Sequence, residues 1–210
     1  MKKYVFTLIA IVLCIGTNAQ DDRNDQDDLR TVFNSTERVG WWIAPEFSWS
    51  QIDNRDAFIG GMSGGIIVNH EFSIGLAAYG IMNPQNFKYS GIIDTADVYL
   101  YGGYGGLKLE YRLFPLNTIN LAFPVLIGGG GVTYSTWGPD NWHGDEDDAY
   151  AWDSFFIIEP GVMAGINILK FMRLDVGVSY RYAPAIDLPE TDSDLMNGFN
   201  ANISLKFGRF

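Results

Sequence analysis

The strongest constraint on the fold is an alternation of apolar and polar residues that recurs eight times between residues 38 and 208. In residues 173–182, every second residue from Leu174 to Tyr182 is apolar, and the residues between them are charged, polar or glycine. Because successive side chains of a β-strand point to opposite faces, this period of two indicates strands with one apolar and one polar face. Beyond the first 19 residues, apolar residues do not recur at helical spacing over 12 residues or more. The sequence therefore predicts an all-β fold.

The alternating segments define eight predicted strands and two classes of connection. The strands are predicted at residues 38–50, 58–69, 72–83, 98–113, 120–135, 155–168, 173–183 and 199–208. The short connections are 69–71, 115–118 and 170–172, and the longer, polar ones are 51–57, 84–97, 136–154 and 184–198. Short turns on one side and longer loops on the other are typical of outer-membrane barrels. We expect an eight-stranded antiparallel up-and-down transmembrane β-barrel in the outer membrane, with both termini on the periplasmic side.

The first 37 residues differ from the rest of the chain. Lys2 and Lys3 precede an apolar run over 4–15, and small residues follow up to Ala19, a pattern typical of a secretory signal peptide. This run is too short for a helix that crosses the bilayer, which needs roughly 20 residues. We predict a signal peptide at 1–19, an acidic disordered leader at 20–37 and the barrel at 38–210.

Composition excludes several classes of function. The net charge is −11 and the pI is near 4.4, which argues against binding to nucleic acid. The hydrophobic fraction of 47% excludes a disordered chain. The single cysteine, Cys14, lies in the predicted signal peptide, so the sequence provides neither a disulfide framework nor a Cys/His zinc site.

The polar faces of the predicted strands carry charged residues that a barrel would enclose. In lipid every backbone polar group needs an internal partner, which a closed sheet provides, and side chains fill the interior of an eight-stranded barrel. We therefore expect apolar faces toward lipid and a filled or very narrow lumen. The predicted charges in the lumen are Glu46, Lys108, Glu110, Arg112, Glu159, Arg173, Asp175, Arg181 and Lys206. Because buried charges need partners, we predict a network of salt bridges. Strand direction places Glu46, Glu159 and Arg181 toward the outside and the other six toward the periplasm.

The connection 136–154 is the most unusual stretch of the sequence. It carries six acidic residues together with Trp137, Trp142, His143 and Trp152. We predict an external binding tip for a surface partner, with Asp145, Asp147 and Asp148 as candidate ligands for Ca²⁺, which can bridge the phosphates of lipopolysaccharide. No other cofactor is expected. The alternative is a solvated acidic loop with aromatic residues at the membrane interface.

Motifs for catalysis are weak. Gly61–Gly65 matches the G-x-S-x-G nucleophile elbow around Ser63, but no helix follows it. An enzyme that modifies lipid A would need a histidine together with a serine and an acid near the outer surface. In this sequence His143 is the one histidine on that side, and Ser135 and Ser154 lie near it in sequence. We therefore predict that the protein is not an enzyme. A soluble lipocalin-like binding barrel is a further alternative, because Gly40-Trp41-Trp42 fits the early G-x-W of that class.

The sequence resembles the small OmpA/OmpX-type outer-membrane β-barrels, and specifically the Bacteroidetes-type outer-membrane β-barrel proteins. The resemblance covers about residues 38–210 and rests on Glu159-Pro160-Gly161, on the segment 171–182, on Gly198 and on the closing segment 205–210. It implies residence in the outer membrane, contact with its lipid and lipopolysaccharide, and no assigned chemistry for most members. It also implies that the barrel-insertion machinery uses the C-terminal strand. Phe210 matches the aromatic last residue of that signal, although Phe207 lies three residues before it instead of two.

Overall fold

A computed structural model of the chain describes residues 39–93, 96–135, 149–184, 186–189 and 191–210. The predicted signal peptide and acidic leader lie outside these residues and stay predictions. In the described part of the chain, the helical structure amounts to one 3₁₀ turn at Pro84–Asn86, and no helix there has the length and apolarity to cross a membrane.

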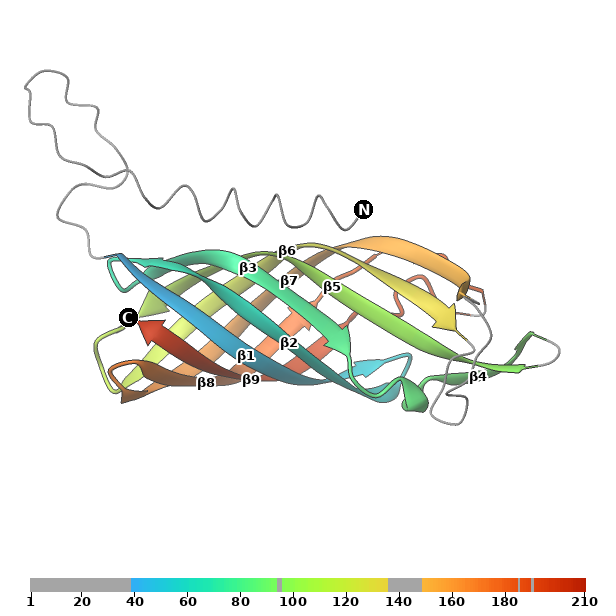
Figure 1. Cartoon of the computed structure of the whole chain (residues 1–210), viewed down its shortest axis with the longest axis horizontal. Helices are drawn as coiled ribbons and strands as arrows, with labels where there is room; N and C mark the ends of the chain where they lie inside the picture. The colour runs from blue at the N-terminus through green and yellow to red at the C-terminus, as the bar shows by residue number, and fades with distance from the viewer. Residues whose placement is uncertain (1–38, 94–95, 136–148, 185, 190) are drawn as a thin grey trace, which may run out of the picture. The chain divides into compact units, whose positions relative to one another are not determined.

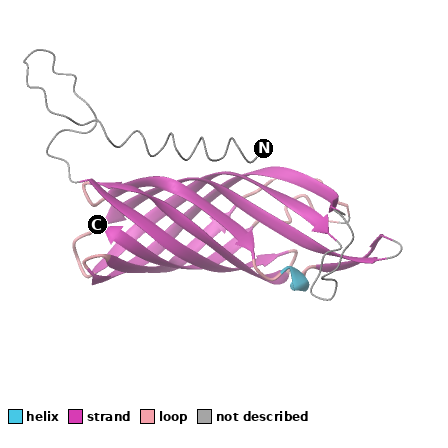
Figure 2. Cartoon of the chain, in the orientation of Figure 1, coloured by secondary structure: helices cyan, strands magenta, loops and turns pink. Residues whose placement is uncertain are grey.

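The fold is a closed antiparallel β-barrel (Figures 1 and 2). Its strands are β1 (Val39–Ile52), β2 (Arg55–Val68), β3 (Phe72–Ile81), β4 (Lys88–Ile93), β5 (Ala96–Leu113), β6 (Ile119–Ser135), β7 (Ala149–Leu169), β8 (Met172–Arg181) and β9 (Gly198–Arg209). They pair in the order β3-β2-β1-β9-β8-β7-β6-β5-β4, and β3 also pairs with β5, which closes the ring. Eight strands form the barrel and β4 lies outside the ring, so the predicted fold class is confirmed.

The two ends of the barrel differ. We call the end that carries β4 and the connection 182–197 the loop end, and the opposite end, which carries the connections 69–71, 114–118 and 170–171, the turn end. The C-terminus and the start of β1 both lie at the turn end (Figure 1).

Two of the predicted long loops are wrong in detail. The predicted loop 51–57 is a tight hairpin, because β1 runs to Ile52 and β2 starts at Arg55. Asp53 and Asn54 form its turn with φ values of 50° and 55°, a left-handed conformation that Asp and Asn tolerate and that two-residue hairpins require. The predicted loop 84–97 contains the 3₁₀ turn and β4, which pairs with the start of β5 and extends that hairpin beyond the barrel.

The outer wall of the barrel is apolar. Along β1, Trp41, Ile43 and Phe47 point outward and are about half exposed, whereas Trp42 and Ala44 point into the lumen and are buried. The same alternation exposes Val176 on β8 and Ile203 on β9. A protein in water would bury so many large aliphatic and aromatic side chains, whereas lipid is a favourable surrounding for them.

Candidate functional site

Four charged side chains form one cluster in the half of the lumen near the turn end. Arg112 on β5 contacts Glu110 Oε1 and Asp175 Oδ2 through Nη2, each at 2.7 Å. Lys206 on β9 contacts the same two acids, with Nζ at 2.5 Å from Glu110 Oε2 and 3.0 Å from Asp175 Oδ2. All four side chains are at most 4% exposed. Two acids and two bases therefore neutralise one another across the lumen.

The close approach of this cluster depends on a glycine. Gly165 of β7 faces the lumen, and a Cβ at this position would collide with the side chains of Arg112, Asn120 and Asp175. Asn120 accepts a further hydrogen bond from Arg112 Nη1. The absence of a side chain at residue 165 thus leaves the guanidinium room to reach its acidic partner.

A second ion pair lies nearer the middle of the barrel. Lys108 Nζ on β5 contacts both carboxylate oxygens of Glu46 on β1, at 2.6 and 2.7 Å. Glu46 also accepts hydrogen bonds from Ser63, from Tyr79 Oη at 2.6 Å and from Ser204 Oγ at 3.3 Å. The sequence placed Glu46 toward the outside and Lys108 toward the periplasm, and this separation is wrong because the tilted strands bring the two residues to one level.

Ser63 is the serine of the G-x-S-x-G motif. It lies within β2, faces the lumen and donates its hydroxyl hydrogen bond to Glu46. The chain continues as a strand on both sides of Ser63, so the motif is not the strand-to-helix turn that an exposed nucleophile requires.

Three of the nine predicted lumen charges have no ion pair within the described residues. Glu159 accepts hydrogen bonds from Ser179 Oγ and Asn200 Nδ2. Arg181, fully buried, donates from Nε to the Met196 carbonyl at 2.6 Å, and Nη1 reaches Asn200 Oδ1 at 3.4 Å. Neutral polar groups thus replace the predicted salt bridges of these two residues.

The third residue, Arg173, lies at the turn end. Its Nε donates to Asn167 Oδ1 at 2.6 Å, and its guanidinium lies 4.2 Å from the ring centroid of Phe210. Phe210 also packs against a small apolar cluster that contains Trp42. Phe210 therefore packs between Arg173 and this cluster at the turn end, a position that its role in the resemblance did not suggest.

The half of the lumen near the loop end is apolar. The expectation that polar side chains fill the whole interior is therefore wrong for this half. Its buried side chains include Ile52, Ile59, Phe87, Val98, Leu100, Val132, Tyr134, Phe155 and Ile157. The described residues of the segment 183–196 fold into this end and add Ala183, Ile186, Leu188, Leu195 and Met196 to the same cluster. Tyr134 Oη donates to the Pro189 carbonyl at 3.3 Å. We call this cluster the apolar half, and the side chains of Glu46, Lys108, Glu110, Arg112, Asp175 and Lys206 the ionic half.

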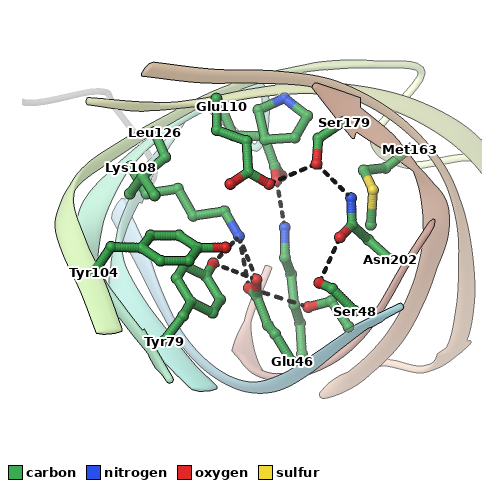
Figure 3. A pocket seen from close by; sticks show the side chains of 14 residues that line it. Glu46, Ser48, Tyr79, Tyr104, Lys108, Glu110, Leu126, Met163, Ser179 and Asn202 are labelled. Atoms are coloured by element: carbon green, nitrogen blue, oxygen red, sulfur yellow. Dashed lines mark hydrogen bonds and ion pairs between the residues drawn. The ribbon is translucent and has the colours of Figure 1, made fainter. Parts of the chain in front are cut away.

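A cavity of about 40 Å³ lies between the two halves (Figure 3). Its lining includes Glu46, Lys108 and Glu159, with Ser179 and Asn202. Figure 3 shows the side chains of Glu46, Lys108, Ser179 and Asn202 converging from several strands of the barrel. The described residues thus leave room in the lumen for small molecules at most.

The predicted binding tip falls mostly outside the described residues. This holds for Trp137, Trp142 and His143 and for the candidate calcium ligands Asp145, Asp147 and Asp148. Trp152 is described, and it lies on β7 instead of in a loop, with 72% of its surface exposed. Within the described ranges, no three His, Cys, Asp or Glu side chains come together as a metal site.

Comparisons with known proteins found similar solved structures. No protein-family model and no curated protein matches the chain. The solved structure of Neisserial surface protein A (NspA) is similar, with a TM-score of 0.54 and 9% identity, over 81% of this chain and 97% of that one. Ail of Yersinia pestis matches at a TM-score of 0.43 and 13% identity over 83% of this chain and 98% of its own. OprG of Pseudomonas aeruginosa matches at 0.42 and 10% identity over 81% and 95%.

The similarity to NspA shows the fold. The chain has the architecture of the small OmpA/OmpX-type outer-membrane barrels.

Proposed function

We propose that this protein is an integral outer-membrane β-barrel with a closed lumen, of the Bacteroidetes type, with both termini in the periplasm. The observation that carries the proposal is the apolar outer wall around a closed sheet, since Trp41, Phe47 and Val176 are each about half exposed while lysine and arginine side chains are buried inside. The outer wall of a soluble binding barrel faces water and does not expose so many large apolar side chains. The lipocalin-like alternative is therefore disfavoured.

The lumen supports a structural or surface-interaction role instead of transport. Ion pairs fill the ionic half, and the segment 183–196 fills the apolar half. An aqueous pore would need a continuous path past both. We propose that the barrel conducts no ions and has no catalytic function.

The first experiment is cell fractionation, followed by gel electrophoresis with and without boiling. We expect the protein in the outer membrane, with a mobility that changes on boiling because a closed barrel resists detergent until it is heated. Purified barrel in a planar bilayer should give no steady conductance. A soluble periplasmic protein whose mobility is unchanged on boiling would overturn the proposal and favour the lipocalin-like alternative.

The loop end is the proposed interaction surface. Its described charges are Asp53, Asp56, Asp97, Asp153, Asp187, Asp192 and Asp194, against only Arg55 and Lys88. The exposed charges of the turn end are Glu71 against Lys170 and Arg209, while Arg173 is buried there. Such an acidic surface attracts cations and repels the anionic groups of lipopolysaccharide unless divalent cations intervene.

We propose that this end, including the connection 136–148, binds a divalent cation or a cationic surface partner. Binding of Ca²⁺ to the barrel in neutral detergent is measured by calorimetry, with and without residues 136–148. We expect the deletion to abolish binding and to leave the heat-dependent mobility unchanged. Calcium binding that survives the deletion would remove this segment, with Asp145, Asp147 and Asp148, from the proposal.

A further inference from the structure

The cavity between the two halves contains a carboxylate whose hydrogen bonding is incomplete. Glu159 Oε1 accepts hydrogen bonds from Ser179 Oγ at 2.5 Å and from Asn200 Nδ2 at 2.8 Å. Glu159 Oε2 is buried, and it has no hydrogen-bond partner among the described residues. Buried polar atoms in folded proteins are almost always bonded to protein or to ordered water, so this oxygen indicates a donor in the cavity.

The charges around the cavity restrict the kind of donor. Both lysines in the lining already have acidic partners, since Lys108 contacts Glu46 and Lys206 contacts Glu110. Their ammonium groups would repel a further cation, and the three acidic side chains would repel an anion. A small neutral molecule with hydrogens to donate fits both constraints.

The lining also supplies acceptors for such a molecule. Tyr79 Oη, Ser179 Oγ and Asn202 Oδ1 belong to side chains that line the cavity together with Glu159. A buried water usually makes about three hydrogen bonds, and a water needs roughly 10–15 Å³ of such space. The cavity of about 40 Å³ therefore has room for roughly three or four water molecules.

We infer that this cavity is a hydration site in the middle of the lumen, where bound water donates a hydrogen bond to Glu159 Oε2. Glu159 is linked to Asn200, and Asn200 Oδ1 accepts from Arg181 beneath the apolar half. The bound water extends this hydrogen-bonded chain toward Glu46 and Lys108. It supplements the protein contacts across the cavity, where Tyr104 packs against Tyr79 and Tyr79 donates to Glu46.

Two methionines make the inference testable in the intact protein. Met163 lines the cavity, and Figure 3 shows its side chain beside Asn202. Met196 is fully buried in the apolar half and serves as the matched control. With ¹³C-labelled methionine methyl groups and the barrel in lipid vesicles, water-edited solid-state NMR measures transfer of magnetisation from water to each methyl group. Met163→Leu and Met196→Leu assign the signals.

We expect clear transfer from water to Met163 and transfer at the noise level to Met196. Equal absence of transfer at both methyl groups would show a dry cavity and overturn the inference. Glu159→Gln keeps an oxygen acceptor and should preserve the transfer, whereas Glu159→Leu removes the acceptor without adding a labelled methyl group and should lower the transfer to the level of Met196. A Met163 chemical shift that changes when Na⁺ is replaced by K⁺ or NH₄⁺ would show that a cation occupies the cavity, which also overturns the inference.

Discussion

The ionic half and the apolar half close the same lumen by different means. In the ionic half, strand side chains alone fill the space, and each charge depends on a particular partner, as Arg112 does on Asp175. In the apolar half, strand side chains leave space that the segment 183–196 fills, and no contact depends on one partner. The comparison shows that particular pairs of residues determine the packing of the ionic half. In the apolar half, the packing depends on the total volume of the buried side chains.

The largest expected effect is the loss of one acid from the ionic half. Asp175→Leu leaves Arg112 and Lys206 buried with Glu110 as their one remaining acidic partner. Breaking a buried ion pair in this way destabilises a protein by about 3–5 kcal/mol. Urea unfolding in lipid vesicles, followed by tryptophan fluorescence, measures the free energy of unfolding. Val176→Leu, the neighbouring residue on the outer wall, is the control and should leave it almost unchanged.

A truncation in the apolar half should have a slightly smaller effect that does not depend on charge. Leu100 is fully buried there, and Leu100→Ala removes its contacts and leaves a cavity. Such substitutions cost about 2–5 kcal/mol. The loss should be the same at low and high salt in the same unfolding assay. A loss that depends on salt would contradict the separation of the lumen into two halves.

Removal of both partners of an ion pair should be less harmful than removal of one. Lys108→Met alone leaves Glu46 buried without its cation, although hydrogen bonds from Ser63 and Tyr79 remain. Glu46→Gln combined with Lys108→Met removes both charges, and neutral replacement of a buried pair is often close to neutral in stability. We expect the double variant to lose about 1–2 kcal/mol less than the single Lys108→Met variant. Additive losses would contradict the pairing.

The smallest expected effect lies outside both halves, at β4, where charges are exposed. The hydrogen bond from Lys88 lowers the pKa of Asp97, with a further contribution from Ser90. A carboxyl group with a lowered pKa stabilises its hairpin above its ordinary pKa, and this contribution is lost as the pH falls through the lowered value. An NMR titration of the Asp97 carboxyl carbon should give a lower midpoint in the native protein than in Lys88→Ala. Equal midpoints would show that the pair is not maintained in solution.

The alternation of apolar and polar residues was sufficient to predict the barrel, because this period of two shows which residues lie on the same face of a strand. It also selected the correct lumen-facing charges on β5 and β8, such as Arg112 and Asp175. The partners were harder to predict, because they depend on strand tilt and register. Glu46 on β1 meets Lys108 on β5, and no property of either sequence segment indicates that contact.

The apolar half was missed although a signal was present. Leu100 and Phe155 occupy the same alternation as the lumen-facing charges of their strands, and Val132 shares that of the buried Asn120 on β6, so their inward direction could have been predicted. The segment 183–196 gave no such signal, because it has no regular period. The turn at Asp53 and Asn54 was missed since both residues are polar and typical of long loops as well as of tight hairpins.

The ion pairs of the ionic half have a mechanical consequence. Lys206 on β9 and Asp175 on β8 contact Glu110 and Arg112 on β5, and β5 lies across the ring from β8 and β9. These contacts span the ring, so the cross-section cannot widen along this direction without separating oppositely charged groups. The interior of the barrel therefore resists such widening together with the hydrogen bonds of its wall.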